Sequence, residues 1–251
     1  MFGQVERPAG RPLIVGHRGA MGYAPENTFA SYERAVALGV DAVECDVHLS
    51  ADGVPVVIHD HTLDRTTDGQ GPVQARTVEQ LKRLDAGAWR GAEFAGQRLP
   101  TLDELLGWCA GRVLLSIELK NGPIFYDGLA DRIVELVRKH RMVDRANVIS
   151  FDHQAIRRVK ELEPRLSAGI LFAARLVDAP AAARAAGAGA ILPAYYFATP
   201  DVVSQAHAAG LMVSVWTVDD PATAAELARI GVDAIASNYP DRVMNGLRVE
   251  G

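Results

Sequence analysis

There are 251 residues, 49% of them hydrophobic and 23% charged, which fits one barrel-sized globular domain or two small ones. The net charge of −5 without a basic stripe argues against a nucleic-acid partner, and two cysteines are too few for a disulfide framework or a metal finger. The sequence has no signal-like apolar stretch near its start and no apolar run long enough to span a bilayer, so we expect a cytoplasmic protein without stable membrane association.

The chain begins with an apolar strand, a loop and a helix. Residues 13–17 are predicted to form the strand, which ends at His17. After a loop that contains glycine and proline, Asn27 or Thr28 can cap the helix, and Gly39 is placed to end it. A strand followed by a helix is the first unit of an alternating α/β chain.

The next strand, around residues 41–48, carries two carboxylates in an otherwise apolar run. Glu44 and Asp46 are two residues apart, so they point to the same face of the strand. Neighbouring carboxylates repel each other and are costly to bury, and a divalent cation is the natural compensation because Mg²⁺ and Ca²⁺ choose carboxylate oxygens. This stretch therefore predicts a cation site, on which other polar side chains are expected to converge.

A hairpin is expected directly after this strand. The turn Ser50–Gly53 is too short for a parallel crossover, which takes about a dozen residues. We therefore expect residues 54–59 to run antiparallel to residues 41–48. Residues 60–100 are turn-rich and irregular, with room for one short helix, and such a long irregular span in a compact domain is usually functional.

From Thr101, which caps a helix, strands and helices alternate regularly, with prolines in first turns and glycines where helices stop. This alternation predicts a mainly parallel sheet. With the hairpin partner set aside, eight strands remain for a (β/α)8 TIM barrel; a doubly wound open sheet is the alternative, although the first loop lacks a dinucleotide-binding G-x-G-x-x-G. The expected strands are residues 13–17, 41–48, 54–59, 113–119, 148–151, 168–172, 190–193, 212–218 and 234–237.

Active sites of such barrels lie at the carboxyl ends of the strands, where this chain has a set of polar and aromatic residues. They are His17, Arg18, Glu44, Asp46, His59, Glu118, Lys120 and Trp216. The carboxylates Glu44, Asp46 and Glu118 can make an all-oxygen site for one divalent cation. Mg²⁺ and Ca²⁺ both suit such ligands, and Mn²⁺ is a further candidate.

The remaining charged and imidazole groups indicate the substrate and the reaction. Arg18 and Lys120 beside a metal imply an anionic substrate, for which phosphate fits best. His17 and His59 can supply one general base and one general acid near neutral pH, without the sequence deciding which is which. A metal, phosphate-binding cations and paired imidazoles are together typical of phosphodiester cleavage.

Most of these residues also have a structural interpretation. The strand carboxylates could form a buried salt-bridge network with Arg18 and Lys120 without any metal. Trp216 is as consistent with core packing as with substrate contact, and we expect Glu26 and Asn27 only to shape the first loop and cap its helix. Five further histidines are interpreted as surface or helix residues, namely His48, His61, His140, His153 and His207.

Separate interpretations apply to two further acidic sites and to one cysteine. Asp60 could orient His59 or bond the loop backbone, and the sequence does not decide between the two. The neighbours Asp219 and Asp220 are most simply the N-terminus of a helix. Cys45 is expected to pack on the back of its strand.

Short motifs follow one another along nearly the whole chain, from about residue 13 to 243. They are His17-Arg18-Gly19, Pro25-Glu26-Asn27-Thr28, Glu44-x-Asp46, His59-Asp60 with Arg65-Thr66-Thr67, Pro100-Thr101-Leu102, Glu118-x-Lys120, Ser150-Phe151-Asp152, Trp216-Thr217-Val218 and Asn238-Tyr239-Pro240-Asp241. In this joint order they resemble the glycerophosphodiester phosphodiesterase family. The resemblance implies one TIM-barrel catalytic domain over residues 1–251, with residues 60–100 as a small family-type insertion after the hairpin strand that bears His59.

The resemblance also implies an activity, the metal-dependent hydrolysis of glycerophosphodiesters such as glycerophosphocholine or glycerophosphoethanolamine to sn-glycerol 3-phosphate and an alcohol. It implies a small-molecule substrate, one divalent cation and these roles: acid–base catalysis by His17 and His59, metal ligation by Glu44, Asp46 and Glu118, phosphate contacts by Arg18 and Lys120, and a glycerol-side wall at Trp216. The oligomeric state, and the choice between attack by water and attack by the glycerol 2-hydroxyl, stay open.

Two other functions are kept as alternatives. A lysophospholipase D or a phosphoinositide phospholipase-like barrel enzyme would need an apolar entrance, and residues 60–100 offer few exposed apolar residues beyond Trp89 and Phe94. A barrel that binds phosphodiesters without turning them over would not need the two histidines. The set of acid–base side chains therefore favours an enzyme.

Overall fold

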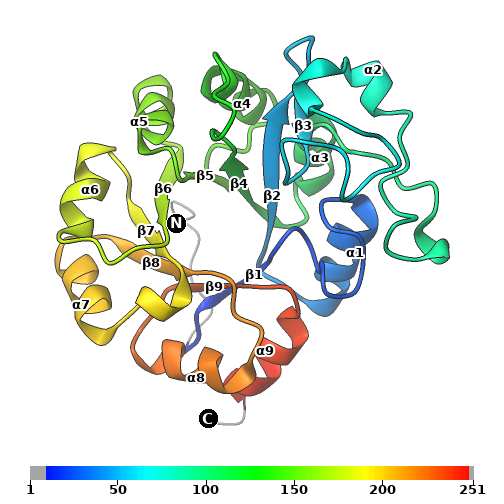
Figure 1. The fold of residues 1–251 in the computed structure, drawn as a ribbon. Helices are drawn as coiled ribbons and strands as arrows, with labels where there is room; N and C mark the ends of the chain where they lie inside the picture. Colours follow the sequence, from blue (N-terminus) through cyan, green and yellow to red (C-terminus); the bar gives the residue numbers. More distant parts are fainter. Residues whose placement is uncertain (1–9, 249–251) are drawn as a thin grey trace.

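The computed structural model describes residues 10–248, and nine strands form its central sheet (Figure 1). The strands are β1 (Leu13–Gly16), β2 (Ala42–Leu49), β3 (Pro55–Val57), β4 (Leu114–Leu119), β5 (Ala146–Ser150), β6 (Ser167–Phe172), β7 (Ala190–Pro193), β8 (Met212–Val215) and β9 (Ala234–Ser237). All pair in parallel except β3, and β1 closes the sheet by pairing with both β2 and β9. The (β/α)8 barrel prediction is confirmed, and the open-sheet alternative is wrong because the sheet has closed on itself.

Helices ring the barrel and pack on its outer face, except for the short helix within residues 60–100 (Figure 1). They are α1 (Phe29–Leu38), α2 (Val78–Leu81), α3 (Leu102–Cys109), α4 (Leu129–Lys139), α5 (His153–Leu162), α6 (Ala179–Ala185), α7 (Pro200–Ala208), α8 (Pro221–Arg229) and α9 (Pro240–Arg248), with short 3-10 turns η1 (Val73–Ala75), η2 (Ala92–Phe94) and η3 (Tyr195–Phe197). Thr28, rather than Asn27, caps α1. No helix within residues 10–248 is long and apolar enough to cross a membrane.

Strand alternation decides which side chains enter the barrel. In β2, Val43 and Cys45 are buried in the large core between the sheet and the helices, as expected for Cys45. Ala42 belongs instead to the smaller cluster that fills the barrel itself. Because side chains alternate along a strand, Glu44 and Asp46 share the face of Ala42 and point into the barrel.

The predicted hairpin is confirmed, and it brings a histidine to the barrel mouth. The last residues of β2 pair antiparallel with β3, and Gly53 takes the positive φ of 74° that the tight turn requires. After β3 the Ile58 N–H donates to the Asp46 carbonyl at 3.0 Å. The short return therefore sets His59 beside the carboxylates of β2.

Residues 60–100 form an irregular segment that builds a small core together with apolar residues of the hairpin return. It contains η1, α2 and η2, and α2 fits the one short helix expected there. The apolar residues of this core are Val56, Ile58, Leu63, Val73, Leu81, Ala86 and Leu99. Figure 1 shows the segment beyond β2 and β3, beside α1. Its description as a family-type insertion within a single domain stays a prediction.

The N-cap of α3 offers a test of the local fold. The Thr101 hydroxyl accepts the Glu104 N–H at 3.2 Å, and the Glu104 carboxylate accepts the Thr101 N–H at 2.8 Å. We expect Thr101→Ala to lower the free energy of unfolding by about 1 kcal/mol in urea denaturation, because the Glu104 N–H loses its side-chain acceptor. Ser204→Ala, exposed within α7, is the control that should cost nothing; equal losses in the two variants would contradict the cap.

Candidate active site

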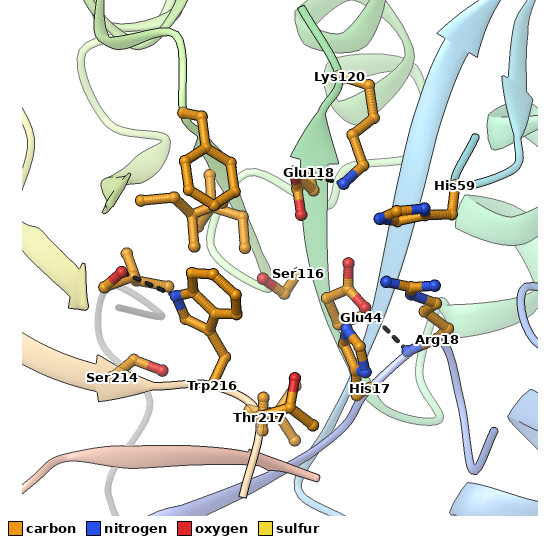
Figure 2. A pocket seen from close by; sticks show the side chains of 16 residues that line it. His17, Arg18, Glu44, His59, Ser116, Glu118, Lys120, Ser214, Trp216 and Thr217 are labelled. Carbon is orange, nitrogen blue, oxygen red and sulfur yellow. Dashed lines mark hydrogen bonds and ion pairs between the residues drawn. The ribbon is translucent and has the colours of Figure 1, made fainter. Parts of the chain in front are cut away.

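A cavity opens at the carboxyl ends of the barrel strands (Figure 2). Seven of the eight predicted site residues line it: His17, Arg18, Glu44, His59, Glu118, Lys120 and Trp216. The eighth, Asp46, is fully buried and contacts two of them. The structure thus brings together side chains from β1, β2, the hairpin, β4 and β8.

The cavity has a charged side and an apolar side. The first strands, the hairpin and β4 supply the carboxylates, cations and imidazoles. The later strands supply the apolar wall, which includes Ile149, Phe151, Leu171, Leu192, Trp216 and Ala236. In Figure 2 the Trp216 ring faces the labelled charged residues across the cavity.

The three carboxylates are close enough to share one ion. Ligand oxygens of Glu44, Asp46 and Glu118 lie within 4.8 Å of one another, and all three side chains are buried. One Glu44 oxygen accepts the Arg18 backbone N–H at 2.8 Å, while its Oε1 is buried without any hydrogen-bond partner. Burial and the neighbouring Asp46 raise the pKa of Glu44 well above its usual value. A buried, unsatisfied carboxylate oxygen next to two others fits a divalent cation.

The metal-free salt-bridge alternative describes only part of this site. Asp46 contacts Lys120 Nζ at 3.0 Å, Arg18 Nε at 3.3 Å and the Asn27 amide at 2.8 Å. Burial opposes the ionisation of Asp46, but Lys120 and Arg18 outweigh it and hold its pKa well below its usual range. Arg18 forms its ion pairs with Glu26 and Asp46, and Glu44 has no ion pair within residues 10–248. The charge of Arg18 only partly opposes the rise in the pKa of Glu44. The cations therefore compensate Asp46 and leave Glu44 uncompensated.

Glu118 combines an ion pair with strong burial. Its carboxylate contacts Lys120 Nζ at 2.6 Å. Burial nevertheless raises the pKa of Glu118 to about 7, against the opposing effect of Lys120. The carboxylates of Asp46 and Glu118 raise the pKa of Lys120 above its usual value, although burial opposes this. Lys120 therefore stays charged over the neutral range.

His17 is held by two polar residues in a chain, Asn238 directly after β9 and Asp219 in the loop after β8. Its Nδ1 lies 2.7 Å from Asn238 Oδ1, and Asn238 Nδ2 donates to Asp219 at 2.7 Å. Burial, helped by Arg18, lowers the pKa of His17 to about 4. The expectation that Asp219 and Asp220 together start a helix is half wrong: Asp220 caps α8, whereas Asp219 bonds Asn238 and Ser237.

His59 is held by a different network. Its Nδ1 lies 2.6 Å from Asp60 Oδ1, so Asp60 orients the ring, the point that the sequence left undecided. Arg65 forms ion pairs with Asp60 at 2.8 Å and with Glu26 at 2.7 Å. Glu26 also forms an ion pair with Arg18 at 2.8 Å. Burial lowers the pKa of His59, with Lys120 and Arg18 acting in the same direction. Glu26 therefore links a cation of the site to the support of His59, more than the loop role expected for it.

Two sequence interpretations near the site need correction. His48 is neither a surface nor a helix residue: it is buried in β2, with Nε2 2.9 Å from the His59 carbonyl and Nδ1 2.9 Å from the Tyr126 hydroxyl. Its spacing of two from Asp46 was the available signal. Asn27 does not cap α1 but bonds Asp46, and it has a φ of 59°.

The backbone of Arg18 is also unusual. It has a φ of 51°, a left-handed conformation that non-glycine residues seldom adopt. This conformation turns its N–H to Glu44, while its carbonyl accepts the Ser31 hydroxyl at 2.8 Å. Strain of this kind tends to cluster at functional sites, and no sequence motif announces it.

The fold and the cavity define a (β/α)8-barrel protein with a buried acidic triad between cations and imidazoles. Residues 17–242 match the glycerophosphoryl diester phosphodiesterase family, a family of hydrolases, and the chain belongs to it. A glycerophosphodiester phosphodiesterase of Caldanaerobacter subterraneus subsp. tengcongensis is 36% identical over 242 residues, which cover 96% of this chain and 100% of that protein.

Solved structures agree with this family assignment. A phosphodiesterase of Oleispira antarctica, in complex with the product sn-glycerol-3-phosphate, has a TM-score of 0.87 and 33% identity, covering 95% of this chain and 97% of that one. A glycerophosphodiester phosphodiesterase of Agrobacterium tumefaciens has a TM-score of 0.82 and 35% identity, covering 92% of this chain and 98% of that one. The resemblance of the motifs to this family is thereby confirmed.

The raised pKa of Glu118 predicts a pH-dependent stability. Its folded-state value of about 7 exceeds the ordinary 4.5, so the folded state binds this proton more tightly than the unfolded state does. The cost of burying the charged form is absent at low pH and grows as the pH rises through that window. In EDTA, we expect urea unfolding to show the wild type losing stability from pH 5 to pH 7 relative to Glu118→Gln.

The control for this measurement is Glu135→Gln, on the exposed side of α4. Its stability should follow the wild-type curve across the same pH range. Parallel curves for the wild type and Glu118→Gln would contradict a buried, proton-binding Glu118.

Proposed function

We propose that this protein is a metal-dependent glycerophosphodiesterase, which hydrolyses substrates such as glycerophosphocholine and glycerophosphoethanolamine to sn-glycerol 3-phosphate and an alcohol. The observation that carries the proposal is the unsatisfied Glu44 oxygen in an acidic triad that shares its cavity with two cations and two imidazoles. Membership of the family and the product complex of the Oleispira antarctica relative support the same substrate class.

The metal ligands are proposed to be Glu44, Asp46 and Glu118. Their oxygens suit a hard divalent cation, Mg²⁺ or Ca²⁺, with Mn²⁺ as a further candidate. When bound, such a cation withdraws negative charge from phosphate oxygens as the phosphorus is attacked. Arg18 and Lys120 then bind the remaining phosphate charge, since both line the cavity and stay protonated.

His17 is proposed as the general base. Because the Asn238 amide donates to Asp219 through Nδ2, its oxygen faces His17 and can only accept. His17 therefore carries its proton on Nδ1, and Nε2 keeps the lone pair. With a pKa of about 4, the ring is neutral at pH 7 and ready to take a proton from the attacking hydroxyl.

His59 is proposed as the general acid. Its Nδ1 contacts the Asp60 carboxylate, which stabilises an imidazolium, whereas the partner of His17 is an uncharged amide. In the free protein burial and the cations Lys120 and Arg18 lower the pKa of His59. A bound phosphodiester anion offsets the charge of those cations and so favours the protonated His59 ring. The ring then donates its proton to the oxygen of the leaving alkoxide.

Trp216 is proposed to line the glycerol side of the substrate. Its ring is held by an N–H bond to the Leu192 carbonyl at 2.9 Å and by the edge of Phe151, with ring centroids 5.4 Å apart. A fixed aromatic wall opposite the charged residues gives the carbon skeleton of glycerol an apolar surface. It also orients the phosphate towards the cations.

The main test measures glycerol 3-phosphate released from glycerophosphocholine. Activity should disappear in EDTA and return with Mg²⁺, Ca²⁺ or Mn²⁺. His17→Ala and Glu44→Ala should each lose at least about a hundredfold in kcat, the low end for one acid–base group. His61→Ala, which does not line the cavity, is the matched control and should keep its activity.

Either of two results would reject this proposal. One is a wild type that is inactive with every cation although it is folded. The other is full activity in EDTA, which would leave the acidic triad without a catalytic role.

The tautomer of His17 gives a second, sharper test. Asp219→Asn should leave the Asn238 amide free to turn, so His17 Nδ1 loses its fixed acceptor. We expect kcat to fall by about tenfold or more, with KM nearly unchanged, and the ¹⁵N spectrum of His17 to change from one tautomer to a mixture. Asp220→Asn is the control, because asparagine caps a helix as well as aspartate does. A single Nδ1-protonated tautomer in Asp219→Asn would contradict this positioning role.

A further inference from the structure

His48 is a buried polar residue beside the active site that the proposed mechanism does not use. It lies on β2, two residues after Asp46, and only 2% of its surface is exposed. Because side chains alternate along a strand, His48 points to the same face of β2 as Glu44 and Asp46. A polar ring is costly to bury unless its nitrogens are hydrogen-bonded, and both nitrogens of His48 have a partner.

One nitrogen of His48 holds the backbone of His59. His48 Nε2 lies 2.9 Å from the His59 carbonyl. A carbonyl oxygen can only accept a hydrogen bond, so His48 Nε2 carries a proton and is the donor. This direction of the bond is the same whether the ring is neutral or charged.

The contact lies just beyond the end of the hairpin ladder. Val57 is the last residue of β3 that pairs with β2, and the Ile58 N–H makes one more bond, to the Asp46 carbonyl. His59 follows outside the paired strands, where no regular ladder fixes the backbone. The His48 ring therefore holds the backbone of His59, while Asp60 holds the His59 ring through Nδ1 at 2.6 Å.

The other nitrogen of His48 is held by Tyr126, in the loop after β4. The Tyr126 hydroxyl lies 2.9 Å from His48 Nδ1, and the two rings pack edge to face with centroids 5.5 Å apart. The Tyr126 N–H donates to Asn121 Oδ1 at 2.8 Å, and the Asn121 amide donates to Asp152, the N-cap of α5, at 2.6 Å. A chain of hydrogen bonds therefore runs from the start of α5 to the backbone of His59.

We propose that His48, held by Tyr126, is a positioning residue for the His59 ring. The inference rests on the proposed function, in which His59 is the general acid. As the bond from phosphorus to the leaving oxygen breaks, that oxygen takes the His59 proton, and a donor that is misplaced by about 1 Å transfers it poorly. His48 does not line the cavity, so it acts on the reaction through His59.

A purely structural role for His48 would have a different effect. His48 would then only fill and satisfy the space between β2, the hairpin and the loop after β4. Its loss would disturb Asp46 and Lys120, which lie on β2 and directly after β4, and every substrate would be affected alike. Misplacement of the acid instead affects only substrates whose leaving group needs a proton.

The leaving group therefore separates the two roles. Choline leaves glycerophosphocholine as an alkoxide that needs a proton, whereas the p-nitrophenyl ester of glycerol 3-phosphate releases a stable anion. We expect His48→Leu to lower kcat at least about tenfold for glycerophosphocholine and less than about twofold for the p-nitrophenyl ester, with KM nearly unchanged. His59→Ala should show the same selectivity with a larger loss, about a hundredfold, because the acid itself is absent.

Three further variants make the comparison specific. His48→Gln should bring the glycerophosphocholine rate to within about threefold of the wild type, because its amide can donate to the same carbonyl. Tyr126→Phe should lose about threefold, again only with glycerophosphocholine, and it replaces His48→Leu if that variant does not fold. His153→Leu is the control: it removes a similar bond, from His153 Nε2 to the Leu171 carbonyl at 2.9 Å, and should leave the ratio of the two rates unchanged.

Where His59→Ala is selective, equal losses on both esters in His48→Leu, or no loss on either, would overturn the positioning role. If the wild type cleaves neither ester, or if His59→Ala is not selective, the proposed activity or its assigned acid is rejected, and the NMR signal of the His59 Nδ1 proton decides. This proton should give a downfield ¹H signal in the wild type and in His48→Gln, and should be lost to exchange with water in His48→Leu. A signal that is retained in all three proteins would reject the inference.

Discussion

The charge on Asp46 constrains the whole site. This carboxylate is fully buried, and the Arg18 guanidinium, the Lys120 ammonium and the Asn27 amide all converge on it. A buried charge is tolerated only when it is paired and hydrogen-bonded, and removal of one partner leaves the others uncompensated. Since the partners come from the loop after β1 and the end of β4, one carboxylate on β2 fixes the relative positions of both cations.

The charged and the apolar side chains of the candidate site come from different strands of the barrel. The early strands supply charge, and the imidazoles are distinguished by what holds Nδ1: an amide for His17 and a carboxylate for His59. The later strands supply an apolar wall. Because the loops of β5 to β7 carry none of the proposed metal ligands or acid–base groups, changes there can alter which substrate is accepted while the chemistry stays the same.

The sequence was informative where chemistry or periodicity is local. The spacing of Glu44 and Asp46, the short turn before β3 and the strand–helix alternation were enough to predict the barrel and the candidate site. Roles that depend on distant partners were not readable: Asp219 resembled a helix cap and His48 a surface residue. The partners, Asn238 for Asp219 and the His59 carbonyl for His48, become neighbours only when the strands pair. The spacing of His48 from Asp46 indicates the face that it shares but does not name its partner.

Barrel closure also has a consequence for when the site becomes competent during synthesis. His17, directly after β1, is among the first parts of the chain to be made, yet its ring is held by Asn238, 221 positions later. β1 likewise has its second neighbour only when β9 arrives. While the protein is still on the ribosome, the early strands can present carboxylates and cations, but the proposed base has no fixed orientation. The proposed catalytic site can therefore form only after β9 has been made. A chain that ends before β9 would retain most of the proposed catalytic side chains without a working site.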